Sequence, residues 1–203
     1  MRPRALWAAL LVFALAAEAG AAKAPPFKVA SAMGGTLTSD GKPVSVGAEL
    51  RDGAVVRLDT GQAVLELAEE GRVMLTGPAE LTVGGRGISL ARGRLLSVFR
   101  RLKGSFSVRT PVAVAAVRGT EFFVEARDDG RTYLCLCEGT LEVTGMPGTG
   151  YRKTIRSKHH GSYIFSQHGE RLDRGPWKME NHSEGDIGKL KMRGADPAPV
   201  LKK

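Results

Sequence analysis

Two cysteines are the residues of this chain whose type and spacing best suit chemistry. Cys135 and Cys137 lie two positions apart in the segment Tyr133-Leu134-Cys135-Leu136-Cys137. Because successive side chains of a strand point to opposite faces, both sulfurs are expected on one face with Tyr133, and Leu134 and Leu136 on the other. Their Cα atoms would lie about 6.5–7 Å apart, which is at the outer limit for a disulfide. The two thiolates could hold one metal ion with less distortion.

All four histidines, His159, His160, His168 and His182, lie C-terminal to the cysteines. We take His159 and His160 as candidate partners of Cys135 and Cys137 in a Cys₂His₂ or Cys₂His site. Neighbouring residues of an extended chain face opposite ways, so both histidines can bind only if the loop bends. Three interpretations of the cysteines stay open: buried core thiols, ligands of a transition metal or haem, and a disulfide or redox pair. The default expectation is no cofactor. The C-x-C spacing is looser than the C-x₂₋₄-C of zinc sites, and the C-x-x-C-H pattern for haem attachment is absent.

Recognised catalytic patterns are also absent from the sequence. We find no Gly-x-Ser-x-Gly, no His-Glu-x-x-His and no phosphate-binding loop. Asp and Glu are scattered along the chain, mostly beside turn glycines. We therefore expect a protein that is not an enzyme.

Short apolar runs separated by glycine turns fill the chain from about residue 36 to residue 143. Strands of this length at roughly ten-residue spacing predict an all-β fold, either a twisted β-solenoid-like stack or a sandwich. The runs cover residues 44–46, 54–58, 63–67, 73–75, 81–83, 88–90, 95–99, 106–108, 112–117, 122–125, 133–137 and 140–143.

The first 24 residues have the three parts of a secretory signal peptide. A basic start at residues 1–4 is followed by an apolar run over residues 5–17, and small residues then offer cleavage after Ala19, Ala21 or Ala24. The run is shorter than the roughly 20 residues of a membrane-spanning helix, so we expect no span in the mature chain. The predicted location is periplasmic or secreted, an oxidising compartment in which thiols tend to pair or to bind a ligand.

The formal net charge of +9 favours anionic partners. No Asp or Glu occurs between Leu81 and Thr120, a span that holds eight basic residues, and a second basic group lies at residues 152–158. These residues form either the outer face of a sheet or a patch for an anionic envelope polymer. Nucleic acid is not expected outside the cytoplasm, and no nucleic-acid-binding module is present.

Residues 146–203 form a basic, histidine-containing C-terminal extension. Ser183 can cap a short helix near residues 183–192, with Asp186 placed to complete a capping box. Ile187 and Leu190 lie one turn apart on that helix. The sequence does not predict an oligomeric state.

A family resemblance rests on Thr110-Pro111, on Ala116-Val117-Arg118-Gly119-Thr120-Glu121-Phe122 and on Glu138-Gly139. This pattern resembles the FecR domain, the periplasmic sensory part of iron-dicitrate-type signalling regulators, over roughly residues 30–144. The resemblance implies a β-rich domain at residues 30–145 that binds or scaffolds an envelope protein. Full regulators carry an anti-sigma segment before a membrane span, whereas only four residues precede the apolar run here. We therefore expect an exported stand-alone module, and the family's link to iron is not carried over.

The motif residues also have a physical interpretation of their own. Thr110-Pro111 suits the first or an edge position of a strand, where a missing backbone donor costs least. Gly119 permits a bulge or tight turn that a side chain would block. Arg118 is expected to pair with Glu121 or Glu138, the alternative being contact with an anionic ligand.

Overall fold

The computed structural model describes residues 27–68, 70–100, 102 and 104–192. The predicted signal peptide and its cleavage sites lie outside these residues. Within them the elements are β1 (Phe27–Met33), β2 (Leu37–Ser39), β3 (Lys42–Pro43), β4 (Glu49–Leu50), β5 (Val55–Leu58), β6 (Gln62–Leu67), β7 (Gly71–Gly84), β8 (Gly87–Phe99), β9 (Phe106–Arg109), β10 (Ala113–Val117), β11 (Glu121–Ala126), β12 (Thr132–Gly145), β13 (Arg152–Ser157), β14 (Gly161–His168), β15 (Arg171–Pro176) and α1 (Glu184–Lys191). The predicted all-β class with a short C-terminal helix is confirmed.

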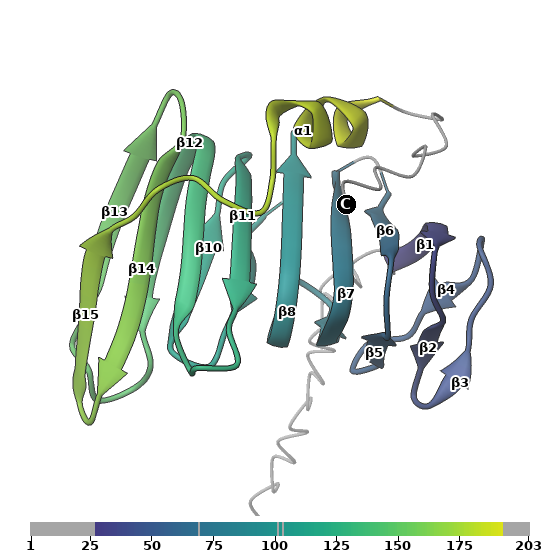
Figure 1. The fold of residues 1–203 in the computed structure, drawn as a ribbon, viewed down its shortest axis with the longest axis horizontal. Helices are drawn as coiled ribbons and strands as arrows, with labels where there is room; N and C mark the ends of the chain where they lie inside the picture. The colour runs from purple at the N-terminus through teal and green to yellow at the C-terminus, as the bar shows by residue number, and fades with distance from the viewer. Residues whose placement is uncertain (1–26, 69, 101, 103, 193–203) are drawn as a thin grey trace, which may run out of the picture.

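Three long strands, β7, β8 and β12, run through two layers of one continuous sheet (Figure 1). Residues 71–76 of β7 pair with β6, whereas residues 79–82 pair with β5. Residues 93–98 of β8 pair with β11, whereas residues 87–89 run parallel to β9. The first half of β12 lies between β11 and β14, and its second half lies between β10 and β13. The strand pairing thus gives stacked layers of one sheet, as the predicted β-rich fold requires.

We call the two layers the first and second sheet layers. The first contains β4, β1, β6, the start of β7, the end of β8, β11, the start of β12, β14 and β15. The second contains β3, β2, β5, the remaining halves of the long strands, β9, β10 and β13. The sequence predicts each long strand as two separate short runs, because glycine interrupts the apolar pattern where the strand changes layer.

Gly139 shows why glycine is needed at such a position. Its φ of +110° lies in the left-handed region, and a Cβ there would come within 2.7 Å of the Cγ2 atom of Thr120. Beyond this residue β12 leaves β11 and pairs with β10. The glycine thus marks the place where the strand passes from the first layer to the second.

The chain has a large core between the layers and a smaller one on the outside of the first layer. The large core includes Leu134 and Leu136 of β12. The smaller core, which we call the outer cluster, consists of Val64, Met74, Leu96, Val98, Phe123, Tyr133, Cys135, Cys137, Ile164, Ile187 and Leu190. The predicted alternation over residues 133–137 is confirmed, because the two cysteines share a face with Tyr133 and the leucines occupy the other.

The C-terminal extension adds β13, β14 and β15 to the sheet and then crosses back over the first layer. We call residues 177–183 the strap, and Figure 1 shows it passing over β14, β12 and β11 toward α1. The predicted capping box is present, with Ser183 as N-cap and Asp186 returning the contact. Among the described residues, no helix has the length and apolar character needed to span a membrane.

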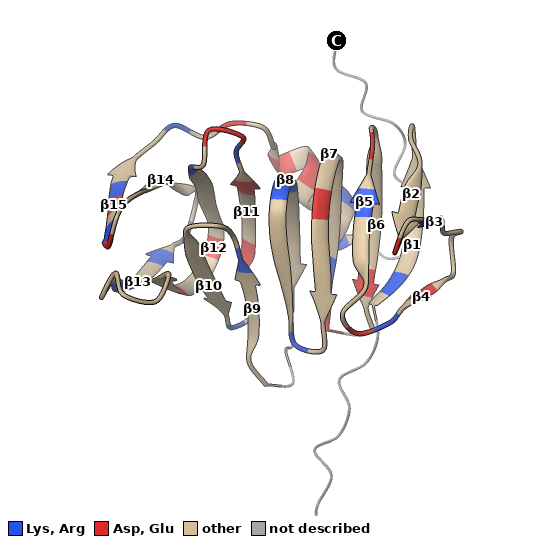
Figure 2. Ribbon diagram, turned by 90° about the horizontal axis from the view of Figure 1, so that it is seen from below, with Lys and Arg blue, Asp and Glu red and all other residues tan. Residues whose placement is uncertain are grey.

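The predicted basic face is largely interleaved with carboxylates (Figure 2). Arg86 pairs with Glu70 at 3.0 Å, and Arg94 pairs with Glu125 at 2.9 Å. The basic residues of β13 are more exposed, since Arg152, Lys153 and Arg156 all lie on the surface of a strand that pairs only with β12 among the described strands. Arg152 pairs with Glu142 of β12 at 3.5 Å, so Lys153 and Arg156 are the two exposed cations of β13 for which the described residues supply no ion pair.

Candidate metal centre

Four metal-binding side chains converge at the end of the strap. The ligand atoms of Cys135, Cys137, His160 and His182 all lie within 4.8 Å of one another. The cysteines come from β12, His160 comes from the turn between β13 and β14, and His182 is the last strap residue before the N-cap of α1. The cluster therefore joins three segments that are far apart in the sequence.

Both cysteine side chains are buried and neither forms a disulfide. The Sγ atom of Cys135 lies 3.4 Å from Nδ1 of His160, and that of Cys137 lies 3.5 Å from Nε2 of His182. A sulfur and a nitrogen that share a tetrahedral zinc ion lie about 3.6 Å apart, given bond lengths of about 2.3 and 2.0–2.1 Å. Both measured distances are thus close to those of a tetrahedral zinc centre.

His160 is oriented by a carboxylate. Its Nε2 donates to Oε1 of Glu184 at 2.5 Å, so Nδ1 is the nitrogen that faces Cys135. The side chain of His160 is only 9% exposed. Its backbone φ of +45° lies in the left-handed region, in the turn between β13 and β14. A carboxylate behind a histidine in this way is the usual support of a metal-binding imidazole.

His182 is oriented by a backbone carbonyl. Because a carbonyl oxygen can only accept, Nδ1 of His182 donates to the carbonyl of Glu180 at 2.8 Å, and Nε2 presents its lone pair to Cys137. The ring also stacks on Phe123, with centroids 4.6 Å apart. Both histidines therefore have their outer nitrogen occupied and their inner nitrogen directed at a thiol.

The cluster also favours ionisation of one thiol. The interaction with Cys137, reinforced by the facing histidines, holds the pKa of Cys135 well below its usual range. The same interaction, together with burial, raises the pKa of Cys137. Burial alone would lower the pKa of His160, but its bonds with Cys135 and Glu184 raise it overall. A thiolate is the form of cysteine that binds a metal.

Sequence reasoning brought forward His159 and His160, and the structure treats them differently. His160 joins the cysteines, whereas the His159 side chain is 78% exposed and faces Glu184 at 3.7 Å. His182 takes the fourth position, and His168 lies exposed at the end of β14. Because neighbouring residues of an extended chain face opposite ways, the sequence indicated that the side chains of His159 and His160 diverge. No local pattern pointed to His182, which reaches Cys137 through the folding of the strap.

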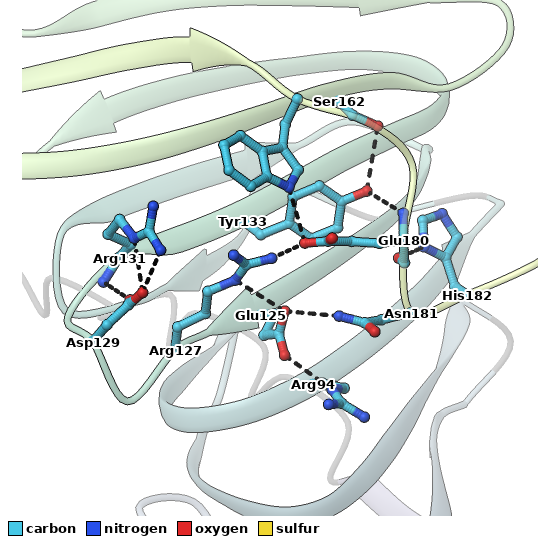
Figure 3. Close-up of polar contacts among 11 residues, drawn as sticks. Arg94, Glu125, Arg127, Asp129, Arg131, Tyr133, Ser162, Glu180, Asn181 and His182 are labelled. Carbon is cyan, nitrogen blue, oxygen red and sulfur yellow. Dashed lines mark hydrogen bonds and ion pairs between the residues drawn. The ribbon is translucent and has the colours of Figure 1, made fainter. Parts of the chain in front are cut away.

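The strap is held in place by a polar network around Arg127 (Figure 3). Arg127 bonds Glu125 at 3.2 Å and forms an ion pair with Glu180 of the strap. The backbone N–H of Glu180 donates to the hydroxyl of Tyr133 at 3.1 Å, and Asn181 donates to Glu125 at 3.0 Å. Because these bonds fix residues 180 and 181, they also place the neighbouring His182.

Comparison with known proteins identifies the β domain. Residues 38–142, about half of the chain, match the family model described as FecR protein. The chain belongs to the FecR protein family. No curated protein matches it. Two crystal structures of a "putative anti-sigma factor" from Parabacteroides distasonis ATCC 8503 are similar to it, both at 18% sequence identity, with TM-scores of 0.48 and 0.49. The similarity covers 60% of this chain and 59% of theirs.

Most residues of the FecR motif have contacts that belong to the fold. The hydroxyl of Thr110 accepts from the N–H of Ala113 and from the hydroxyl of Thr132, at 3.2 and 2.8 Å, in the turn that contains Pro111. Thr120 and Phe122 are buried. Thr110 thus belongs to a turn, and Thr120 and Phe122 belong to the buried interior.

The Arg118 pairing expected from the sequence is not found. Arg118 is exposed, and within the described part of the chain it pairs with neither Glu121 nor Glu138. Glu121 instead bonds Lys191 of α1 at 2.6 Å. Gly119, with a φ of +66°, turns the chain between Arg118 and Glu121. Lys191 of α1 then takes the place at Glu121 that the sequence assigned to Arg118.

Proposed function

We propose that this FecR-family protein is an exported, non-catalytic binding module of the bacterial cell envelope that holds one Zn²⁺. The ligands are Cys135, Cys137, His160 and His182. The observation that carries the proposal is the convergence of four donor atoms within 4.8 Å, together with an acceptor behind each histidine. A set of donors that is oriented before any ion binds is typical of a metal site.

The donor set favours zinc over the other metal groups considered from the sequence. Two thiolates and two imidazoles in a tetrahedral arrangement are characteristic of structural zinc sites. Haem fits less well, because its macrocycle already supplies four ligands to the iron, whereas here four side-chain donors point at one centre. Coordination would also protect both thiols from oxidation in an exported protein.

The same residues include an arrangement that resembles a catalytic nucleophile, base and acid. Cys135 faces His160, and His160 bonds Glu184. A nucleophile must meet its substrate, however, and the Cys135 side chain is 0% exposed beneath the strap. This burial supports a structural metal site and a non-catalytic protein.

Partner binding is best supported at the β13 edge. Lys153 and Arg156 are exposed there, so an acidic envelope protein that adds a strand or an anionic envelope polymer would meet complementary charge. Purified protein is tested against vesicles containing lipopolysaccharide and against an envelope extract. Binding that disappears in Lys153→Glu/Arg156→Glu supports the edge, whereas unchanged binding of the variant to both contradicts it.

The metal assignment is tested by elemental analysis of the exported full-length protein. We expect one zinc per chain, and tetrahedral absorption bands after replacement by Co²⁺. Cys137→Ser and His182→Ala should lose the stoichiometric metal, whereas His159→Ala and His168→Ala should keep it. Metal-free wild-type protein that remains metal-free after incubation with Zn²⁺ would rule the site out.

Export is tested separately by fractionation and N-terminal sequencing. A mature product that begins after Ala19, Ala21 or Ala24 in the periplasm or medium is the expected result. A cytosolic product that retains residues 1–24 would contradict the proposed location.

A further inference from the structure

The strap and α1 cover an apolar surface on the outside of the first sheet layer. Ile187 and Leu190 of α1 are 2% and 4% exposed, and they lie in one cluster with Val64, Leu96 and Phe123 of the sheet. Figure 1 shows α1 above the ends of β8 and β7. Removal of the strap and helix would leave this part of the sheet open to solvent.

The helix is too short to hold this position by itself. It has eight residues, two of which are Gly185 and Gly188, and only Ile187 and Leu190 are buried. Isolated helices shorter than about 12–15 residues are marginal in water, and glycine weakens them further. Docking of α1 therefore depends on burial of these two side chains and on the contacts at its two ends.

The C-terminal end of α1 is held by side chains of the sheet. Arg72 donates to the carbonyl of Met192 at 2.8 Å, and Arg100 donates to that of Lys191 at 2.9 Å. Both bonds are exposed, so each contributes little on its own. Lys191 also pairs with Glu121 of β11 at 2.6 Å, and the Glu121 side chain is only 17% exposed. The N-terminal end is the other point of attachment.

The candidate metal centre lies at that other end. His182 directly precedes the N-cap Ser183, and Glu184 in the first turn of α1 accepts the bond from His160. Cys135 and Cys137 belong to the sheet beneath. One metal ion bound to all four ligands would thus connect the sheet directly to the residue that begins the helix.

We propose that the metal acts as a latch: its binding, added to the Arg127 network, fastens the strap and α1 over the outer cluster, and its loss loosens residues 177–192. This inference rests on the proposed zinc site and adds that metal occupancy controls exposure of an apolar sheet face. Because binding and docking share His182 and Glu184, each must favour the other to the same extent.

Hydrogen exchange on the full-length protein, with and without a chelator, tests the latch. After zinc removal we expect amide exchange of residues 184–192 to accelerate at least about tenfold, while exchange in β7 and β8 stays slow. Unchanged exchange of α1 in protein that has demonstrably lost its zinc would overturn the latch and leave the metal site intact. Failure to bind zinc at all would instead reject the proposed function.

Trp177 offers a second readout, because the other tryptophan, Trp7, lies in the predicted signal peptide. Trp177 is 38% exposed and lies near Arg127 and Arg131, at 5.7 and 5.9 Å. Chelation should make its fluorescence more accessible to a neutral quencher. Equal quenching with and without zinc would count against release of the strap.

Two variants separate the latch from damage to the FecR domain. His182→Ala changes only the strap, so the sheet should stay folded while α1 exchanges as in chelated protein. Leu190→Asp leaves all four ligands intact but disfavours docking, and reciprocity predicts weaker zinc binding by about tenfold. His159→Ala is the matched control and should behave as wild type. Wild-type zinc affinity in Leu190→Asp, with its helix undocked, would contradict the coupling.

Discussion

The imidazole of His182 lies almost flat against the ring of Phe123, with an angle of 8° between their planes and 4.6 Å between centroids. Phe123 belongs to β11, and its register partner on β12 is Cys135. The aromatic side chain therefore supports one metal ligand from the strap beside another from the sheet.

Phe123→Leu removes this stacking but keeps an apolar side chain at the site. Because His182 loses the surface that fixes its ring, we expect zinc affinity to fall by about tenfold, as for other residues that orient metal ligands. A competition titration with a chromophoric chelator measures the change. Phe122→Leu is the control, since Phe122 is buried in the core between the layers. Equal affinities in the two variants would show that the stacking does not matter.

Arg127→Ala removes the central cation of the network that holds the strap. The Arg127 side chain is 17% exposed and bonds both Glu125 and Glu180, so we expect a loss of about 2 kcal/mol in the free energy of unfolding. Urea unfolding measures this loss. Arg131→Ala removes an exposed ion pair with Asp129 and should change stability by no more than about 0.5 kcal/mol. Similar values for both variants would contradict a special role for Arg127.

Alternation and capping rules predicted the local parts of the site. The face shared by Cys135, Cys137 and Tyr133 follows from the period of a strand, and the start of α1 follows from Ser183 and Asp186. Both depend on interactions between residues close in the chain. Such interactions can be read from a sequence.

The fourth candidate ligand could not be predicted in this way. His182 lies 45 positions from Cys137, and its approach depends on how the strap crosses β14, β12 and β11. The same holds for the two-layer path of β7, β8 and β12, since glycine marks both a turn between strands and a bend within one strand. Glu121 pairs with Lys191 for a similar reason, because the helix arrives from the far end of the chain.

Gly139→Ala tests the bend in β12. Alanine would have to adopt a φ of +110° and would bring its Cβ to within 2.7 Å of Thr120, so we expect a loss of about 3 kcal/mol. Gly130→Ala is the matched control, because its φ is +78° and no atom lies within 4 Å of the added Cβ. That variant should lose about 1 kcal/mol. Equal losses in thermal unfolding would mean that the contact with Thr120 is relieved without cost.

Thr110→Val tests the structural interpretation of the FecR motif. The substitution keeps the shape of a buried side chain but removes the hydroxyl that bonds Ala113 and Thr132, so we expect a loss of about 1–3 kcal/mol. Thr110→Ser retains the hydroxyl and should lose less. If Thr110→Val instead unfolds like wild type, the turn after β9 does not depend on these bonds.

Zinc should raise the thermal stability of the wild-type protein in proportion to the logarithm of its free concentration. A ligand that binds only the folded state stabilises it by about 2.7 kcal/mol at 100 times its dissociation constant, which corresponds to roughly 5–10 °C in a domain of this size. Calorimetry over a series of buffered zinc concentrations measures the effect. His159→Ala should respond over the same zinc concentrations, whereas His182→Ala should respond only at higher ones, because loss of the fourth ligand weakens binding. A full zinc response in His182→Ala would mean that the strap does not contribute to metal binding.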